Sequence, residues 1–226
     1  MCTTLLYDIT DRKMSYEALQ KQHSKMALLL QVSRAIAEQT HSGALSQVIV
    51  DGIAQLTEMK SAAIYLLKDH QLHLEATYPP LPKDFPAELR TAVLEDHPHI
   101  ARTLSGKKPV VIADSAQADL TPAEGEVVRM RSLRSILYMP LIYRDSCIGV
   151  LIPCSVGEVQ PITDDMIDLA RILAGQAALS ITEAHRAEQQ QRYIREIERK
   201  NLDLEEARLV IQENERRLSD ILRFAD

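Results

Sequence analysis

The pattern of apolar residues and helix breakers divides the chain into a mixed middle section and two helical ends. All ten Pro lie between Pro79 and Pro161, and every Gly lies between Gly43 and Gly175. Because Pro and Gly both disfavour helix interiors, the two ends can form long helices while the middle forms a compact domain.

Two amphipathic helices are predicted before the first strand. Residues 14–40 form the first, and its apolar stripe is Met26, Leu29, Leu30 and Ile36. The second begins at Ser42 and ends with "TEM" at 57–59. Its stripe, at helical spacing, is Leu45, Val48, Ile49, Ile53 and Leu56.

The period then changes to that of strands. The segments "SAAIYLLK" (61–68) and "QLHLEATY" (71–78) are separated by a short polar link around His70, which predicts an antiparallel hairpin. In 61–68 both alternating sets of side chains are apolar, so this strand should be covered on both faces.

From Pro79 to Ser135 the predicted elements are shorter. We expect a helix at "HIARTLSG", a strand at "PVVIAD" and a helix at "TPAEGEVVRM". Thr121, Pro122 and Glu124 give this last helix an N-cap, a first-position proline and a capping-box acid. Two longer strands follow, "SILYMPLIY" and "CIGVLIP".

The last predicted helix begins after Thr163 and contains no Pro. Its first half is apolar enough to pack on a domain, whereas its second half is charged and carries one heptad row typical of a coiled coil: Ile197, Leu204, Ile211 and Leu218. We therefore predict a parallel homodimer through the terminal helices. Two partner rows are open: Tyr193, Lys200, Ala207, Asn214 and Ile221, or Ile194, Asn201, Arg208, Glu215 and Leu222.

Composition narrows the functional classes. The 226 residues carry a formal net charge of -6, which gives no general attraction to nucleic acid. No apolar run approaches the roughly 20 residues that span a bilayer, and the first residues lack a signal-peptide pattern, so we expect a cytoplasmic protein without membrane insertion.

Cysteine usage predicts neither a disulfide framework nor a metal site. The chain has three Cys, and the odd separation of Cys147 and Cys154 on one strand predicts that they lie on opposite faces. The sequence identifies no cofactor.

The order of these segments resembles a known family. The run from Arg134 to His185 looks like the closing half of a GAF domain, through Pro140-Leu141, Ile148-Gly149-Val150-Leu151 and "LAGQAALSI". "VVIADSA" and "SAAIYLL" extend the resemblance backwards to the helix pair at 14–58. Met166 stands where the family commonly has an acid, and we expect this to affect only the helix start.

The resemblance implies an α+β fold over residues 41–182. A six-stranded antiparallel sheet would carry the long helices on one face and a small-molecule pocket on the other. Candidate ligand-binding residues from the pocket-forming region and its flanks are Tyr78, His97, His99, Arg129, Arg131, Arg134 and Tyr138.

These candidates have less specific interpretations as well. The two His could bind a metal or haem, but without a Cys or a carboxylate pair nearby they are interpreted as loop residues. The arginines suit an anionic ligand, and a solvated charged surface is the alternative. The tyrosines could equally belong to the core.

Both ends resemble parts of PAS domains. "LLYDITDRK", within residues 1–13, resembles the last strand and exit of a preceding PAS-like domain, or a linker. Residues 14–40 would then be a signalling helix, and residues 183–226 a coiled-coil helix leading toward another PAS-like domain. This implies a multidomain sensor with a histidine kinase or diguanylate cyclase as the covalently linked output domain.

We therefore predict a non-catalytic sensory module that binds a small molecule, dimerises, or does both. The alternatives are a structural dimerisation spacer without ligand and an enzyme of the free methionine sulfoxide reductase type, which the cysteine placement disfavours. No nucleophile, base and acid form a recognisable set, and no Gly-rich phosphate loop occurs. The family's cyclic-nucleotide signature and its bilin-binding Cys-His pair are also not found.

Overall fold

The computed structural model describes residues 26–39, 42–81 and 90–223, together with Tyr16, Gln20 and His23, and side chains up to residue 214 and at Arg216. Residues 1–13, for which a PAS-like exit or a linker was expected, most of 14–25 and the side chain of Leu218 lie outside this description. The chain divides into two compact units, Met1–Glu183 and Ala184–Asp226.

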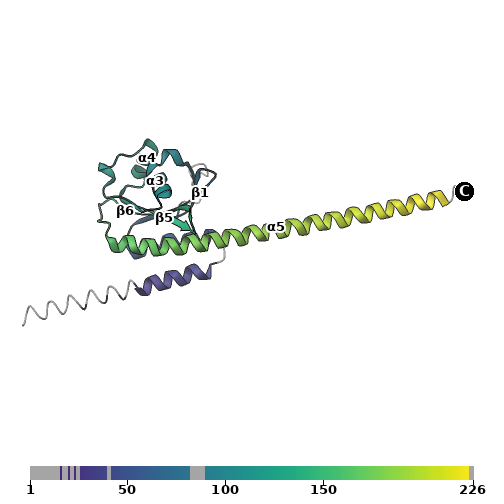
Figure 1. Ribbon diagram of the computed structural model, residues 1–226, viewed down its shortest axis with the longest axis horizontal. Coiled ribbons are helices and arrows are strands. Elements are labelled where there is room, and N and C mark those ends of the chain that lie inside the picture. Colours follow the sequence, from purple (N-terminus) through teal and green to yellow (C-terminus); the bar gives the residue numbers. More distant parts are fainter. Residues whose placement is uncertain are drawn as a thin grey trace, which may run out of the picture. The chain divides into compact units, whose positions relative to one another are not determined.

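A six-stranded antiparallel sheet forms the centre of the first unit, in the order β3-β2-β1-β6-β5-β4 (Figure 1). The predicted fold class is confirmed. The sequence pattern did not predict strand β3, because its three residues are too few to show an alternation. The strands are β1 Ser61–Lys68, β2 Gln71–Tyr78, β3 Thr91–Val93, β4 Val110–Ile112, β5 Leu133–Tyr143 and β6 Ser146–Val156.

The hairpin of β1 and β2 has the predicted strands. Asp69 and His70 connect them with φ angles of 50° and 62°. Two residues with positive φ make the kind of tight turn that matches the twist of the strands. In β1, Ala62 and Ile64 are fully buried on one face and Ala63 is buried on the other, which confirms that this strand is covered on both sides.

The helices lie on both faces of the sheet. In Figure 1, α3 and α4 lie on one face, while α5 runs along the other. α2 packs against β1, β2 and β6. The helices are α2 Ser42–Thr57, α3 Pro98–Gly106, α4 Pro122–Met130 and α5 Asp164–Arg223, with short 3-10 turns η2 Leu94–Asp96 and η3 Ser115–Gln117.

The predicted starts of α4 and α5 are confirmed. The amide of Glu124 donates to Thr121 Oγ1 at 3.2 Å, and the amide of Thr121 donates to Glu124 Oε2 at 3.3 Å, which completes the capping box. At α5 the amide of Met166 donates to Thr163 Oγ1 at 3.3 Å. The Met166 side chain is buried, so it also contributes to packing.

Residues 26–38 are helical and pack on both α2 and α5. Val32 lies so close to Gly52 that a Cβ there would come within 2.5 Å of Val32 Cγ1. Ser33 Oγ donates to Gln176 Oε1 of α5 at 2.9 Å. The predicted apolar stripe is partly wrong, because Ile36 is buried and Leu29 is half-buried but Met26 and Leu30 are exposed.

One prediction about β6 is wrong. Cys147 and Cys154 pack against the same hydrophobic cluster instead of lying on opposite faces. The register between β5 and β6 shifts between Leu141 and Ile142, where two residues of β5 stand opposite three of β6. An extra residue in one strand reverses the alternation of faces beyond it, which moves Cys147 to the side of Cys154.

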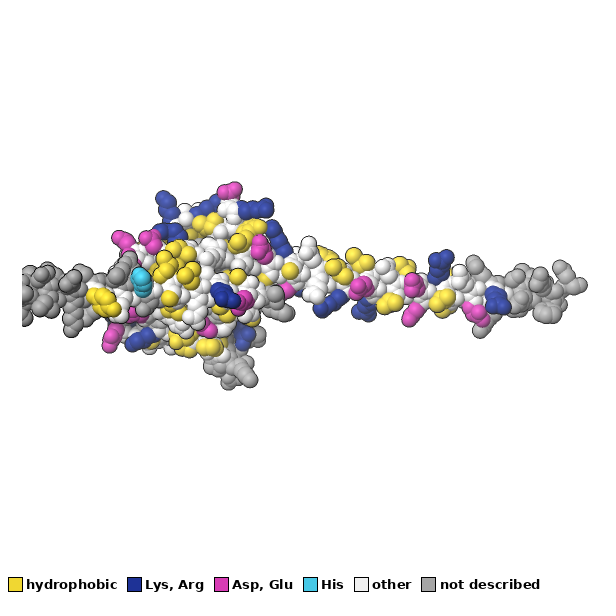
Figure 2. Space-filling model, turned by 90° about the horizontal axis from the view of Figure 1, so that it is seen from below, with side chains coloured by type: hydrophobic (Ala, Val, Ile, Leu, Met, Phe, Trp, Pro, Cys, Tyr) yellow, Lys and Arg dark blue, Asp and Glu magenta, His cyan; other side chains and the backbone are white. Residues whose placement is uncertain are grey.

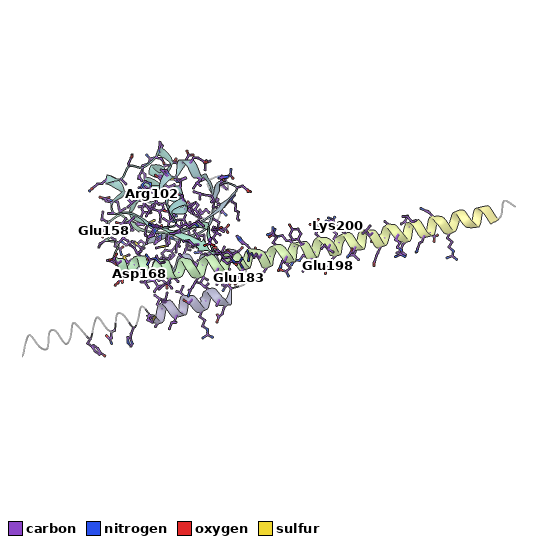
Figure 3. The ribbon with its side chains drawn as sticks, viewed as in Figure 1. Arg102, Glu158, Asp168, Glu183, Glu198 and Lys200 are labelled. Carbon is purple, nitrogen blue, oxygen red and sulfur yellow. The ribbon has the colours of Figure 1, made fainter. Side chains whose placement is uncertain are left out.

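In the second unit, α5 continues as a helix with apolar side chains among charged ones (Figure 2). Ile197, Leu204 and Ile211 of the predicted heptad row are 58%, 67% and 58% exposed. Glu198 and Lys200 project from different sides of the helix (Figure 3). Across the part of the chain that was described, no helix is long and apolar enough to cross a membrane.

Candidate functional site

A cavity of about 60 Å³ lies between the sheet and the helices α3 and α4. Strands β1, β2, β5 and β6 contribute to its wall, and α4 contributes Val127 and Val128. Most of the wall is apolar. The polar and titratable residues that line it are Ser61, Tyr65, His97, Glu124, Arg131, Tyr138 and Cys154.

Three of the seven predicted ligand-binding residues, His97, Arg131 and Tyr138, are in the cavity wall. Tyr78, Arg129 and Arg134 are not among the lining residues. The guanidinium of Arg134 instead forms an ion pair with the carboxylate of Asp114 at 3.0 Å, which ties the start of β5 to the turn after β4.

His99 does not line the cavity but contacts two residues that do, Tyr138 and Glu124. Its ring stacks on Tyr138 with centroids 5.9 Å apart, and its Nδ1 lies 2.9 Å from both carboxylate oxygens of Glu124. The backbone amide of His99 also donates to Glu124 Oε1 at 3.2 Å. Glu124 therefore joins the start of α3 to the start of α4, and the two His have different environments instead of forming a ligand pair.

Glu124 has a second role, its bonds to His99, which its local motif does not predict. The capping box identifies it as the N3 acid of α4, but its bonds to His99 cross 25 residues of sequence. Tyr65, Ser61 and Cys154 were not predicted as lining residues either. The alternation in β1 and β6 could have placed them on one face, but not against a cavity.

Burial controls the protonation of the groups around the cavity. Loss of hydration raises the pKa of the Tyr65 and Tyr138 hydroxyls, so both remain protonated at neutral pH. Burial also lowers the pKa of His97, and the nearby charges of Glu124 and Asp96 oppose that shift only in part. His97 is therefore held toward its neutral form.

The thiol in the cavity is poorly suited to nucleophilic or redox chemistry. Burial raises the pKa of Cys154 to about 12, which leaves almost no thiolate at neutral pH. Cys147 packs against the same cluster but is not part of the cavity wall. Among the described residues, no group of three or more His, Cys, Asp or Glu could hold a metal ion.

The fold agrees with the family comparison. The model of the GAF domain matches residues 43–181, which lie within the range 41–182 expected for the domain. The chain therefore belongs to the GAF domain family. No curated protein matches its sequence.

Solved structures share this fold at low sequence identity. The GAF domain of an Acinetobacter phosphoenolpyruvate-protein phosphotransferase is 18% identical with a TM-score of 0.58, covering 72% of this chain and 95% of that one. Residues 122 to 287 of a methyl-accepting chemotaxis protein are 16% identical with a TM-score of 0.58, covering 68% and 96%.

A third similar structure is an enzyme. Free methionine-R-sulfoxide reductase from Neisseria meningitidis, in complex with its substrate, is 17% identical with a TM-score of 0.59, covering 72% of this chain and 91% of that one. GAF domains are mostly regulatory and non-catalytic, and at these identities the likeness concerns the fold alone.

Proposed function

We propose that this chain is a non-catalytic sensory module in which a small molecule enters the cavity and biases helix α5, which passes the change to an output domain. The observation that carries the proposal is the cavity itself. It lies on the α3/α4 face of the sheet, and β1, β5 and β6 separate it from the face on which α2 packs. Such pockets, mostly apolar with a few polar groups, are typical ligand sites.

The shared strands offer a physical route between the two faces. Ala63 and Ile152 line the cavity, whereas their neighbours Ala62, Ile64 and Leu151 are fully buried on the opposite side. Because interiors are close-packed, a displacement of these strands on one side changes the packing on the other. A ligand shifts the equilibrium only if it binds one arrangement more tightly than the other.

We also propose that the module is a parallel homodimer through its terminal helices. In the first unit, Ile172 and Leu179 of α5 are 48% and 46% exposed. They precede Tyr193 by 21 and 14 residues, both multiples of seven, so they extend the heptad row of Tyr193. The alternative row extends back to Leu173, which is fully buried within its own chain.

This difference favours one register for the proposed coil. The Ile197 row would pair with the row that contains Tyr193, Lys200, Ala207 and Asn214. Lys200 and Asn214 are polar, and polar seam residues lower the stability of a coil while fixing its register. A weak seam of this kind can move between two packings under the influence of a ligand.

The wider context follows from the PAS-like ends. In this proposal the module belongs to a cytoplasmic multidomain sensor whose output is a histidine kinase or a diguanylate cyclase. A structural dimerisation spacer without ligand is the alternative. The reductase-type enzyme is less well supported, because Cys154 is the one cysteine among the described residues of the cavity wall and its thiol stays protonated.

Two measurements on the full chain test the sensory proposal. Native mass spectrometry of gently purified protein reports both the stoichiometry and any retained small molecule. Hydrogen exchange then compares wild type with Val128→Phe, which fills the cavity from α4, and with Val111→Phe, a control on an exposed position of β4 outside the cavity wall.

A sensor should show changed amide protection in α5 with Val128→Phe and unchanged protection with Val111→Phe. A dimer of bare chains, with the same α5 protection in all three proteins, would overturn the sensory proposal in favour of the spacer.

A further inference from the structure

The acidic and the basic side chain of the cavity wall, Glu124 and Arg131, differ in how far they are already paired. Glu124 is occupied. Its oxygens accept from His99 Nδ1 at 2.9 Å, from the His99 amide at 3.2 Å and from the Thr121 amide at 3.3 Å. Because these donors use the carboxylate, Glu124 is poorly placed to bind a cationic ligand.

Arg131 is in the opposite situation. It caps the C-terminus of α4 and is half-buried, and its guanidinium forms no hydrogen bond or ion pair with any residue that the structure describes. Its charge lowers the pKa of Tyr65 on β1 and of Cys154 on β6, against the larger effect of burial. The positive charge therefore acts on the strand side of the cavity.

A half-buried guanidinium that lacks a charged partner is stabilised when an anion pairs with it. The other two arginines of this region do not share this condition, since Arg134 is paired with Asp114 and Arg129 is exposed. Of the three, Arg131 alone combines a place in the cavity wall with a guanidinium that has no partner among the described residues.

Neutral donors accompany this charge. The hydroxyls of Tyr65 and Tyr138 keep their protons, and neither forms a hydrogen bond with a described residue. A ligand group that only accepts hydrogen bonds can use these hydroxyls together with the guanidinium. A carboxylate is such a group, and it also neutralises the charge of Arg131.

The rest of the cavity limits the size and polarity of the ligand. A single water molecule needs about 10–15 Å³ of such space, so 60 Å³ accommodates about four to six groups of that size. The remaining surface suits a hydrocarbon tail better than an inorganic anion, because it consists largely of Ala63, Leu72, Ile100, Val127, Ile136 and Ile152.

We propose that the cavity binds a short-chain monocarboxylate, with the carboxylate on Arg131 and the tyrosine hydroxyls and the hydrocarbon tail against the apolar wall. This inference rests on the proposed sensory function and names the chemical class of its ligand. Arg131 is then the residue that determines specificity for an anion.

Isothermal titration calorimetry of the full chain with butyrate tests this assignment. Butyrate has six non-hydrogen atoms, and butyramide has nearly the same shape without the charge. Hydrogen bonds to a charged group are stronger than those between neutral groups. Butyrate should therefore bind at least about tenfold more tightly than butyramide. Butylamine and inorganic phosphate should not bind in the cavity.

Matched arginine variants test which guanidinium contributes to the affinity for butyrate. Arg131→Gln should weaken butyrate binding at least about tenfold. Arg129→Gln, two residues earlier in the last turn of α4 and outside the cavity wall, should leave it unchanged. Tyr65→Phe should weaken it less than Arg131→Gln, because it removes one neutral donor and keeps the ring.

Several results would overturn the assignment. Equal affinities for butyrate and butyramide would show that the charge of the ligand does not contribute to binding. Equal losses of butyrate affinity in Arg131→Gln and Arg129→Gln would show that the position of Arg131 in the cavity wall does not matter. If butylamine or butyramide binds instead and Val128→Phe abolishes that binding, the ligand class is wrong while the sensory cavity stands. If no probe binds, the carboxylate assignment fails, and the exchange experiment on α5 decides the sensory function separately.

Discussion

The two parts of helix α5 have the same backbone conformation and opposite environments. In the first unit, Leu173 and Ala177 are fully buried and Ile181 is nearly so, all within their own chain. Beyond Ala184, Ile197 and Leu204 remain more than half exposed. An apolar stripe with a sheet beside it stabilises the domain, whereas an apolar stripe without one is available to a second chain.

The different environments of the two parts of α5 also account for their different composition. The buried stripe of the first part is rich in Ala, including Ala170, Ala174 and Ala178, which lets a helix approach a sheet closely. The second part spaces single Ile and Leu residues seven apart among charged residues. Spacing of that kind suits helix-to-helix packing between chains.

The largest expected effect should alter dimerisation through the second part of α5 and leave the folding of the first part intact. Replacing Ile197, Leu204 and Ile211 together with Glu removes several apolar contacts per chain and puts charges in the seam. The dissociation constant of the proposed dimer should rise at least about a thousandfold. Analytical ultracentrifugation should therefore show monomers, while thermal unfolding of the domain stays cooperative. A dimer of unchanged affinity would show that the seam lies elsewhere.

A single truncation in each part gives the next largest contrast. Leu173→Ala leaves a hole in the core and should lower the free energy of unfolding of the domain by about 2–5 kcal/mol. Leu204→Ala is introduced into a variant that carries Ile197→Glu and Ile211→Glu. By the same denaturant titration it should change the free energy of unfolding by less than about 0.5 kcal/mol. Equal losses would contradict the division between the two parts.

Glycine substitutions test the exposed side of the first part. Gly175 lies between Ile172 and Leu179 on α5, and a Cβ there meets no other atom within 4 Å. In the monomeric Glu variant, Gly175→Ala should raise the free energy of unfolding by up to about 1 kcal/mol.

Gly52→Ala is the matched control, because its Cβ would lie 2.5 Å from Val32 Cγ1 and 3.3 Å from Val32 Cβ. It should lower the same free energy by roughly 1 kcal/mol, since the strain exceeds the gain in helix propensity. If Gly52→Ala proved as stabilising as Gly175→Ala, residues 26–38 would not pack on α2 as described.

The smallest expected effect concerns pH and should appear only in the first unit. The pKa of His97 in the folded domain is below its ordinary value of 6.5, so below pH 6.5 the unfolded chain binds more protons there. The stability that the folded domain gains by keeping His97 neutral is therefore present above pH 6.5. It is lost as the pH falls from 6.5 through the lower pKa of the folded state.

His97→Gln should flatten this part of the stability profile, measured by denaturant unfolding between pH 5.5 and 7.5. The affinity of the proposed dimer should respond equally to pH in wild type and variant. An identical pH slope of unfolding in both proteins would exclude His97 as the source.

Local signals predicted much of the fold. The hairpin from Ser61 to Tyr78 follows from two apolar runs and a short polar link, and the start of α4 follows from the spacing of Thr121 and Glu124. Such features depend on residues close in sequence, so the pattern contains the necessary information. The three-residue strand β3 and the displaced face of Cys147 depend on neighbouring strands, and no local pattern shows them.

For the candidate site, the sequence supplied residue types and the structure selected among them. Arg129, Arg131 and Arg134 are equivalent by composition and lie within six residues of one another. Only tertiary contacts assign Arg134 to Asp114, leave Arg129 exposed and place Arg131 in the cavity wall.

The sequence by itself determined the family, the sheet with its long helices, and the apolar row at the end of α5, because periodicity and capping act over a few residues. Only the tertiary structure decided which polar groups face the cavity and which of them are already paired. That assignment depends on contacts such as His99 with Glu124, 25 residues apart, which form when the helices pack on the sheet.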